Sequence, residues 1–330
     1  MENRKADHLS LALTNQVYAS QKDERFRYEP FLQGSRDQEI PPVSIGGKEM
    51  KLPIWISSMT GGTKLGGTIN HHLARAAAEF GLGMGLGSCS ILLKNEKALP
   101  DFNLRHIIGN ERPFYANMGI AQVEHFLKKD DLKTITDLVN LLDTDGLVIH
   151  VNPIQEMMQP EGDRITMPPI ETIREFVNNF SGNVIVKEVG QGMGRESLSQ
   201  LLKIPLTAIE FGALGGTNFA KVELRRNSSE TTAHLEPLTF VGHTAEEMTF
   251  TLNELITNTK IKNTPNLIIS GGIKNFLDGY YLINKSKATA MYGMASALLE
   301  YAVEDYEKLR FFLSAQAQGL KTAYTYLKVV

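Results

Sequence analysis

Residues 146–188 contain the pattern that decides the fold. They begin with an apolar run, Gly146-Leu147-Val148-Ile149-His150, and end with a second one, Val184-Ile185-Val186-Lys187-Glu188. Between these runs, residues 168–180 place apolar side chains three and four positions apart, as an amphipathic helix does. A strand, a helix and a second strand in this order predict a βαβ unit with parallel strands.

The same alternation extends along the chain. Eight apolar runs are candidate strands: residues 53–58, 83–86, 114–117, 146–150, 184–188, 208–211, 267–270 and 288–292. Amphipathic segments separate several of them: residues 70–80, 168–180, 195–202, 244–258 and 275–284. Eight strands alternating with helices predict an α/β fold that closes into a TIM (β/α)8 barrel, with a doubly wound open sheet as the alternative.

A single catalytic domain of 330 residues is expected, longer than a minimal barrel. The additional residues form an N-terminal arm (1–45), a long loop between the sixth strand and the sixth helix (213–243), and a helical C-terminal tail (311–326). Because residues 213–243 are too many for a simple connector, we expect this loop and the arm to be mobile and to close over bound ligands as a lid. The tail is expected to close the bottom of the barrel or to pack against a neighbouring subunit.

Composition narrows the class of protein. A net charge of −3 without a basic cluster argues against a nucleic-acid partner or an anionic membrane. No apolar run is long enough to span a bilayer, and the N-terminus lacks the apolar core of a signal peptide. Cys89 is the only cysteine, which excludes an intrachain disulfide and predicts a reducing, cytoplasmic location.

Polar and glycine-rich segments follow the candidate strands, where the active sites of barrels lie. Residues 149–163 combine a histidine, amides and carboxylates, which could bind a charged ligand together with a metal ion; a polar surface loop is the alternative. Residues 270–273 and 293–295 predict a phosphate cradle of backbone N–H groups. Barrels also need tight turns for structural reasons, so each glycine-rich turn alone has two interpretations.

Two single residues have alternative interpretations. Lys187 ends an apolar strand, so its ammonium would enter the barrel mouth, where a ligand's negative charge could offset it. In a flavin site such a lysine can stabilise the N1 and O2 edge of the reduced ring; an ion pair with Glu188 is the alternative. Cys89 could be a nucleophile, as in purine nucleotide dehydrogenases of similar architecture. We favour a buried, inert thiol, because the chain lacks the arginine–tyrosine flap of those enzymes.

Several motifs resemble, in order along residues 4–300, those of type 2 isopentenyl-diphosphate isomerases. They are Arg4-Lys5-Ala6-Asp7-His8, Ser58-Met59-Thr60-Gly61-Gly62-Thr63, His150-Val151-Asn152-Pro153-Ile154-Gln155-Glu156, Gln159-Pro160-Glu161-Gly162-Asp163, Val186-Lys187-Glu188-Val189-Gly190 and Gly215-Gly216-Thr217-Asn218-Phe219. The α-hydroxyacid oxidases, another class of FMN barrel, share only the glycine turns.

The resemblance implies an FMN-dependent enzyme of isoprenoid biosynthesis that interconverts isopentenyl and dimethylallyl diphosphate. Mg²⁺ would bind the substrate, NADPH would reduce the flavin, and reduced FMN would act as an acid–base catalyst. A homo-oligomer, a tetramer or an octamer, is also implied.

The same resemblance assigns roles to individual residues. His150 and Gln155 would be catalytic, and Glu156 would bind Mg²⁺. The substrate would contact Arg4, Lys5, His8, Asn152 and Gln155. FMN would contact Met59, Thr60, Gly61, Ser88, Asn117, Lys187, Thr217, Gly271, Gly272, Met294 and Ala295.

Three departures from the family pattern accompany the match. Ser88-Cys89-Ser90 stands where many members have Ser-Gln-Arg, which predicts the loss of a cationic phosphate contact. Glu210-Phe211-Gly212-Ala213 replaces Asp-Val-Ser-Gly, which predicts a lost hydroxyl and an added bulky ring near the cofactor. Asp7 replaces a glutamate. These changes leave a second hypothesis, a flavin-binding barrel of the same family with an altered prenyl substrate or no isomerase activity.

Overall fold

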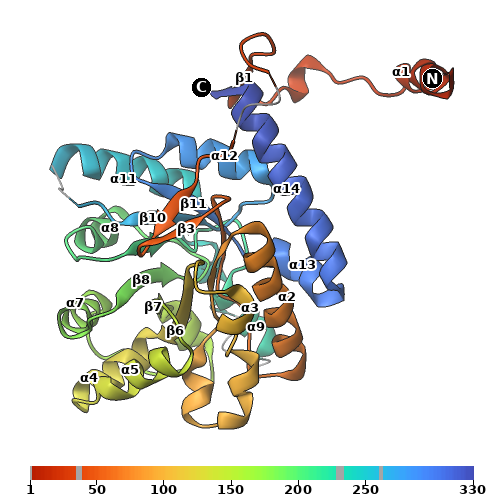
Figure 1. The fold of residues 1–330 in the computed structure, drawn as a ribbon. Coiled ribbons are helices and arrows are strands. Elements are labelled where there is room, and N and C mark those ends of the chain that lie inside the picture. The colour runs from red at the N-terminus through yellow and green to blue at the C-terminus, as the bar shows by residue number, and fades with distance from the viewer. Residues whose placement is uncertain (1, 35–38, 228–233, 260–262) are drawn as a thin grey trace.

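Eight parallel strands close into a barrel in the computed structural model, which describes residues 2–34, 39–227, 234–259 and 263–330 (Figure 1). In barrel order the strands are β4 (Ile54–Ile56), β5 (Gly83–Gly85), β6 (Phe114–Gly119), β7 (Gly146–Val151), β8 (Asn183–Glu188), β9 (Ala208–Glu210), β10 (Asn266–Ser270) and β11 (Ala290–Met294). Each lies in one of the predicted runs or overlaps it. The TIM barrel is therefore confirmed, and the open sheet is excluded.

Helices surround the barrel and connect its strands. The outer helices are α2 (Lys64–Phe80), α4 (Ile120–Lys128), α5 (Leu132–Leu141), α7 (Pro169–Asn179), α8 (Arg195–Leu201), α11 (Ala245–Thr259), α12 (Phe276–Lys285), α13 (Ser296–Glu304) and α14 (Tyr306–Tyr326). Short helices lie in the loops: α3 (Arg105–Ile108), α6 (Pro153–Met158), α9 (Phe219–Arg226), and the 3₁₀ helices η1 (Ala19–Gln21), η2 (Cys89–Leu93), η3 (Glu96–Asp101) and η4 (Glu236–Phe240). None of the helices in the described ranges is both long and apolar enough to cross a membrane.

Local sequence explains where these helices begin and end. In α2, the N-cap Thr63 hydroxyl accepts a hydrogen bond from the Gly66 N–H, 3.1 Å away. The same helix ends at Gly81, whose φ of 67° lies in the left-handed region. Its buried face consists mostly of small and apolar side chains, with the amide of Asn70 as the polar exception, which lets the helix pack closely against the strands.

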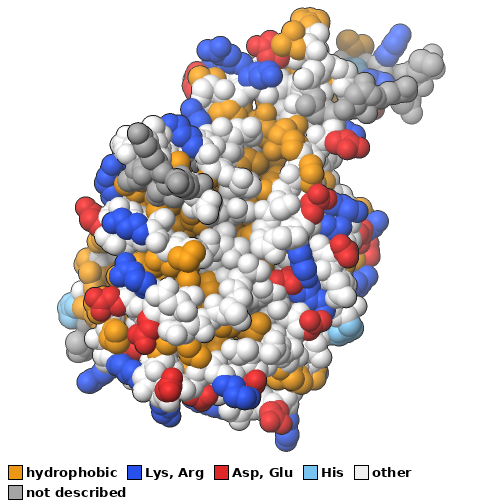
Figure 2. All heavy atoms as spheres, turned by 60° about the vertical axis from the view of Figure 1, so that its left-hand side comes forward, with side chains coloured by type: hydrophobic (Ala, Val, Ile, Leu, Met, Phe, Trp, Pro, Cys, Tyr) orange, Lys and Arg blue, Asp and Glu red, His pale blue; other side chains and the backbone are white. Residues whose placement is uncertain are grey.

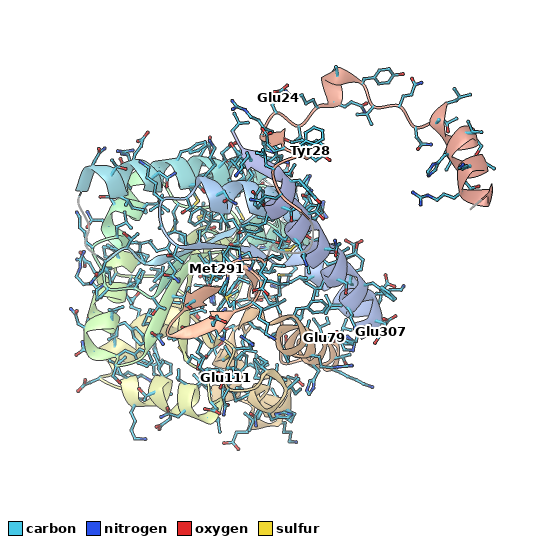
Figure 3. All side chains as sticks on the ribbon, turned by 45° about the horizontal axis from the view of Figure 1, so that its top comes forward. Glu24, Tyr28, Glu79, Glu111, Met291 and Glu307 are labelled. Carbon is cyan, nitrogen blue, oxygen red and sulfur yellow. The ribbon has the colours of Figure 1, made fainter. Side chains whose placement is uncertain are left out.

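The barrel interior is built in layers. An apolar layer is formed by Trp55, Tyr115, Val148, Ile185, Ala208, Ile268 and Met291, of which Met291 is labelled in Figure 3. Successive strand residues point to opposite faces, so the residues two positions further along point inward again. These are Ser57, Asn117, His150, Lys187, Glu210, Ser270 and Gly293. An apolar layer is thus followed, toward the carboxyl ends of the strands, by a layer of polar side chains and glycines, to which β5 adds Gly85.

A hairpin closes the bottom of the barrel. Its strands are β2 (Val43–Ile45) and β3 (Lys48–Met50), and its inward side chains Val43, Ile45 and Met50 join the apolar layer. The C-terminal tail does not have this position, because α14 packs against α2, α12 and α13 on the outside. After α14, the strand β12 (Leu327–Val329) pairs with β1 (Phe26–Tyr28). One of the two expectations for the tail was therefore wrong; packing against another subunit stays a prediction.

The N-terminal arm begins with α1 (Glu2–Ala12), which stands away from the barrel beyond β1 (Figures 1 and 3). Residues 4–20 are all exposed. On the face of the molecule shown in Figure 2, the described Lys and Arg side chains are interspersed with Asp and Glu. This mixture agrees with the near-neutral charge of the sequence.

Candidate active site

Two adjoining cavities lie at the carboxyl ends of the strands. The larger has a volume of about 540 Å³ and the smaller about 140 Å³. Both are lined by Ser58, Met59, Lys187, Val189 and Phe219, so they form one continuous site. The polar layer of the barrel forms the floor, with Ser57, Lys187, Glu210, Ser270 and Gly293 under the larger cavity and Asn117, His150 and Lys187 under the smaller.

Lys187 presents its charge to this floor. Its Nζ donates to the backbone oxygen of Glu188, 2.9 Å away, and forms no ion pair with a carboxylate in the described part of the chain. The Glu188 carboxylate instead accepts the backbone N–H groups of Gly190, Gln191 and Gly192 at 2.7, 2.6 and 3.0 Å. The alternative interpretation of Lys187, an ion pair with Glu188, is therefore wrong. A buried ammonium without a paired carboxylate suits an anionic or electron-rich ligand.

His150 is held in one tautomer by Asn117. The amide nitrogen of Asn117 donates to the Leu86 carbonyl at 2.9 Å, so its Oδ1, 2.7 Å from His150 Nδ1, acts as an acceptor. The ring proton therefore lies on Nδ1, and Nε2 has a free lone pair. Burial and the charge of Lys187 lower the pKa of His150 to about 3, which keeps the ring neutral at neutral pH.

The loop after β7 arranges an amide and a carboxylate. The side-chain N–H₂ of Asn152, just before α6, donates to Gln155 Oε1 at 3.2 Å and to Glu156 Oε1 at 2.8 Å. The second oxygen of Glu156 accepts the Asp163 backbone N–H at 2.7 Å. Gln155 Nε2 donates to Glu223 Oε1 at 3.3 Å, and Gln155 lines the smaller cavity. Its amide is thus oriented from both ends.

Glu223 belongs to the segment that was predicted to be a mobile lid, residues 213–243. In the described part of that segment, α9 packs against α6, and the buried Glu223 also accepts from Gln159 Nε2 at 2.9 Å and pairs with Arg226 at 2.5 Å. Phe219 at the start of α9 lines both cavities. Residues 228–233 lie outside the described residues, and the mobility of the lid stays a prediction.

The predicted phosphate cradle has a geometry suited to an anion. Gly271 and Gly272 have φ of 97° and 77°, and a Cβ on Gly271 would overlap the Ala213 backbone. Ala295, Ser296 and Ala297 at the start of α13 line the same cavity, where helix N–H groups lack intrahelical acceptors. The residues present therefore fit a phosphate group at this end of the larger cavity.

The structure brings most of the predicted site residues together. The larger cavity is lined by Met59, Lys187, Thr217, Gly271, Gly272 and Ala295, and the smaller by Met59, Ser88, Asn117, His150, Gln155 and Lys187. Thr60, Gly61, Asn152, Glu156 and Met294 do not line either cavity. Arg4, Lys5 and His8 lie on α1, away from the barrel (Figure 1). Sequence reasoning did not identify Glu223 or Glu210 as site residues; the helical spacing of residues 219–226 is the signal that could have revealed α9.

Two expectations about unusual residues can be compared with the structure. Phe211 packs in the core outside the strands, so it does not add a ring to the cavity as was predicted. Gly212 has φ of 51°, and a Cβ there would overlap the Glu188 carbonyl, so this position has no room for a side chain.

Cys89 is fully buried, and burial raises the pKa of its thiol to about 12. The predicted burial of Cys89 is confirmed, and the inertness of its thiol stays a prediction.

Solved structures with the same fold are flavoenzymes. A mandelate oxidase variant with an FMN adduct has a TM-score of 0.58 and 13% identity, covering 93% of this chain and 89% of that one. A flavocytochrome b2 variant with sulfite bound has a TM-score of 0.63 and 10% identity, covering 91% and 71%. At these identities the likeness establishes the class of fold, a TIM barrel whose site lies at the carboxyl ends of its strands.

Curated relatives identify the family, although the chain matches no family model. The isopentenyl-diphosphate delta-isomerase of Rickettsia felis is 32% identical over 305 residues, covering 91% of this chain and 85% of that protein. The enzyme of the same name from Rickettsia akari is 31% identical over 303 residues, with the same coverage. The chain belongs to the isopentenyl-diphosphate delta-isomerase family.

Proposed function

We propose that this protein interconverts isopentenyl and dimethylallyl diphosphate with FMN as cofactor. The observation that supports this most is the continuous site, in which a phosphate cradle, the unpaired Lys187, and the oriented His150 and Gln155 share one floor. Family membership and this arrangement support the same chemistry.

The larger cavity fits FMN. Its cradle suits the FMN phosphate, and Lys187 suits the electron-rich edge of the flavin ring. The hydroxyl of Ser58 lines this cavity and has no hydrogen-bond partner among the described residues. A bound polar group would satisfy it. Reduced FMN supplies a group that can donate and accept a proton without a net redox change in the substrate.

The smaller cavity fits the prenyl substrate. Gln155 positions the alkene, because an amide is a poor base and this one is held by Asn152 and Glu223. His150 offers Nε2; a diphosphate nearby adds negative charge, which favours the protonated ring and turns Nε2 into a donor. Phe219 excludes water from the reacting carbons, since it lines both cavities.

Glu156 is proposed to bind Mg²⁺ together with the substrate. In the described ranges, no three or more His, Cys, Asp or Glu side chains form a group that could hold a metal ion alone. Mg²⁺ commonly takes one or two carboxylates, substrate phosphate oxygens and water, so a single glutamate fits. Each Glu156 oxygen accepts one internal hydrogen bond and retains a lone pair.

The remaining parts of the proposal concern the arm and the assembly. Arg4, Lys5 and His8 are proposed to reach the diphosphate when the arm closes, NADPH to reduce the flavin, and the protein to be a cytoplasmic tetramer or octamer. Lys5→Ala should then raise KM for the substrate far more than KM for NADPH. Equal amide exchange in the arm and in residues 213–227 with and without ligands would contradict the lid.

The test of the function is anaerobic incubation with FMN, Mg²⁺, NADPH and isopentenyl diphosphate in D₂O, followed by NMR. The expected result is dimethylallyl diphosphate that carries solvent deuterium and forms only with reduced flavin and Mg²⁺. Bound flavin without product would instead favour a family member with another substrate or without isomerase activity.

A further inference from the structure

The floor of the larger cavity contains a carboxyl group that the proposed reaction does not use. Glu210, at the end of β9, has no exposed surface, and its carboxyl oxygens face the side chains of Ser57, Ser270 and Trp55 without a well-formed hydrogen bond among the described residues. It nevertheless lines the cavity. A fully buried acid with only these weak polar contacts is costly to ionise, which points to an interaction with something that occupies the cavity.

Among the described residues, Lys187 is the cation that lies close to Glu210. Lys187 is its register partner on β8, so the two side chains point inward at the same level. The polar groups around the carboxyl are Ser57, Ser270 and the indole of Trp55. His150, one strand further, is neutral, and Lys274 and Glu300 lie in the wall of the cavity. Burial raises the pKa of Glu210, and the charge of Lys187 opposes this effect.

Charge balance on the floor changes when a flavin is reduced. With a neutral oxidised flavin, the charges of the Lys187 ammonium and the Glu210 carboxylate offset each other across the floor, although the two groups form no direct ion pair. An anionic reduced flavin would add a second negative charge to the floor beside Lys187, and two like charges in a poorly solvated site repel strongly. Protonation of Glu210 would remove the excess charge.

We propose that Glu210 takes up a proton when the bound FMN is reduced to its anion, so that flavin reduction consumes two protons. One FMN, two electrons and two protons give the reduced flavin anion, with one proton on N5, and the neutral carboxylic acid of Glu210. NADPH supplies a hydride, which carries both electrons and the N5 proton, and solvent supplies the proton for Glu210. This inference rests on the FMN binding included in the proposed function.

The midpoint potential of bound FMN, measured by spectroelectrochemical titration at several pH values, tests the proposal. Each proton consumed per two electrons shifts the potential by about 30 mV per pH unit. The wild-type protein should show about 60 mV per pH unit across the range in which Glu210 changes its protonation, and Glu210→Gln about 30 mV. Glu210→Asp, which keeps an acid, should retain the steeper slope. The near-ultraviolet spectrum of the reduced protein identifies the flavin anion.

Controls separate this effect from a change in folding. Glu124→Gln alters another buried carboxyl, one bonded to Lys128 and Thr166 on the outside of the barrel, and should leave the slope unchanged. Equal slopes in the wild type and Glu210→Gln would overturn the proposal. If Glu210→Gln fails to bind FMN, the wild-type protein still tests the proposal. A slope of about 30 mV per pH unit at all pH values measured would then overturn it. Isomerisation is measured separately, so an inactive protein that binds FMN still tests Glu210.

Discussion

Replacing Asn117 by aspartate puts a carboxylate beside the His150 ring with almost no change in side-chain shape. In the wild type, Asn117 Oδ1 lies 2.7 Å from His150 Nδ1, and burial together with Lys187 lowers the pKa of His150 to about 3. A negative charge at this position favours the imidazolium form. We therefore expect Asn117→Asp to return the protonation of His150 to the weakly acidic range.

The size of this effect follows from the geometry. Opposite unit charges about 4 Å apart interact by about 4 kcal/mol at an effective dielectric constant of about 20. Since one pKa unit corresponds to about 1.4 kcal/mol, the pKa of His150 should rise by about 3 units, to about 6. The variant also loses the donor to the Leu86 carbonyl, which should reduce the free energy of unfolding by about 1–3 kcal/mol.

Long-range proton–nitrogen NMR of the histidine rings measures both the tautomer and the pKa. A His150→Gln variant assigns the signal among the eight histidines. Asn117→Ala removes the hydrogen bond without adding charge, so the pKa of His150 should stay well below 6.5 in that control. A wild-type ring that carries its proton on Nε2, or that titrates near pH 6.5, would refute the reasoning.

Three further predictions concern stability, the loop helix and the thiol. The pKa of His150 is about 3 in the folded protein and 6.5 in the unfolded chain, so the unfolded state binds more protons below neutral pH. The free energy of unfolding should therefore fall by about 2 kcal/mol between pH 7 and pH 5. Urea titrations should show that His150→Gln lacks this part of the decrease. Glu223→Ala should free α9 from α6, accelerate amide exchange in residues 219–226 and raise KM for the prenyl substrate, whereas the exposed change Arg225→Ala should do neither. Cys89 should resist iodoacetamide at pH 8 in the folded protein and react after denaturation; rapid labelling of the native protein would contradict its burial.

The barrel could be predicted from the sequence because local patterns determine its elements. A buried parallel strand needs an apolar run, and a helix on its outside needs apolar residues three and four apart. Both patterns lie within short stretches of chain, so they can be recognised without knowledge of tertiary contacts. The hairpin that closes the bottom was not predicted, because only alternate residues of β2 and β3 are buried, which differs from the continuous apolar runs of the barrel strands.

The site could be predicted only in part, because some of its contacts join distant segments. The cradle and Lys187 follow directly from strands, so their position at the barrel mouth could be inferred. The hydrogen bond between Gln155 and Glu223 joins residues 68 positions apart, and local spacing contains no information about it. The same holds for Phe219, whose contact with both cavities depends on how α9 docks.

Strand geometry explains why two interpretations were wrong: the ion pair between Lys187 and Glu188, and the ring of Phe211 in the cavity. Adjacent residues of a strand point to opposite faces, so an inward Lys187 cannot have Glu188 beside it in the barrel, although the two are neighbours in sequence. The same alternation turns Phe211 outward once Glu210 points inward. Register between strands then makes Glu210 the acid next to Lys187 on the floor. Because both side chains belong to the one polar layer beneath the cavity, any ligand that changes charge there alters the free energy of protonating Glu210.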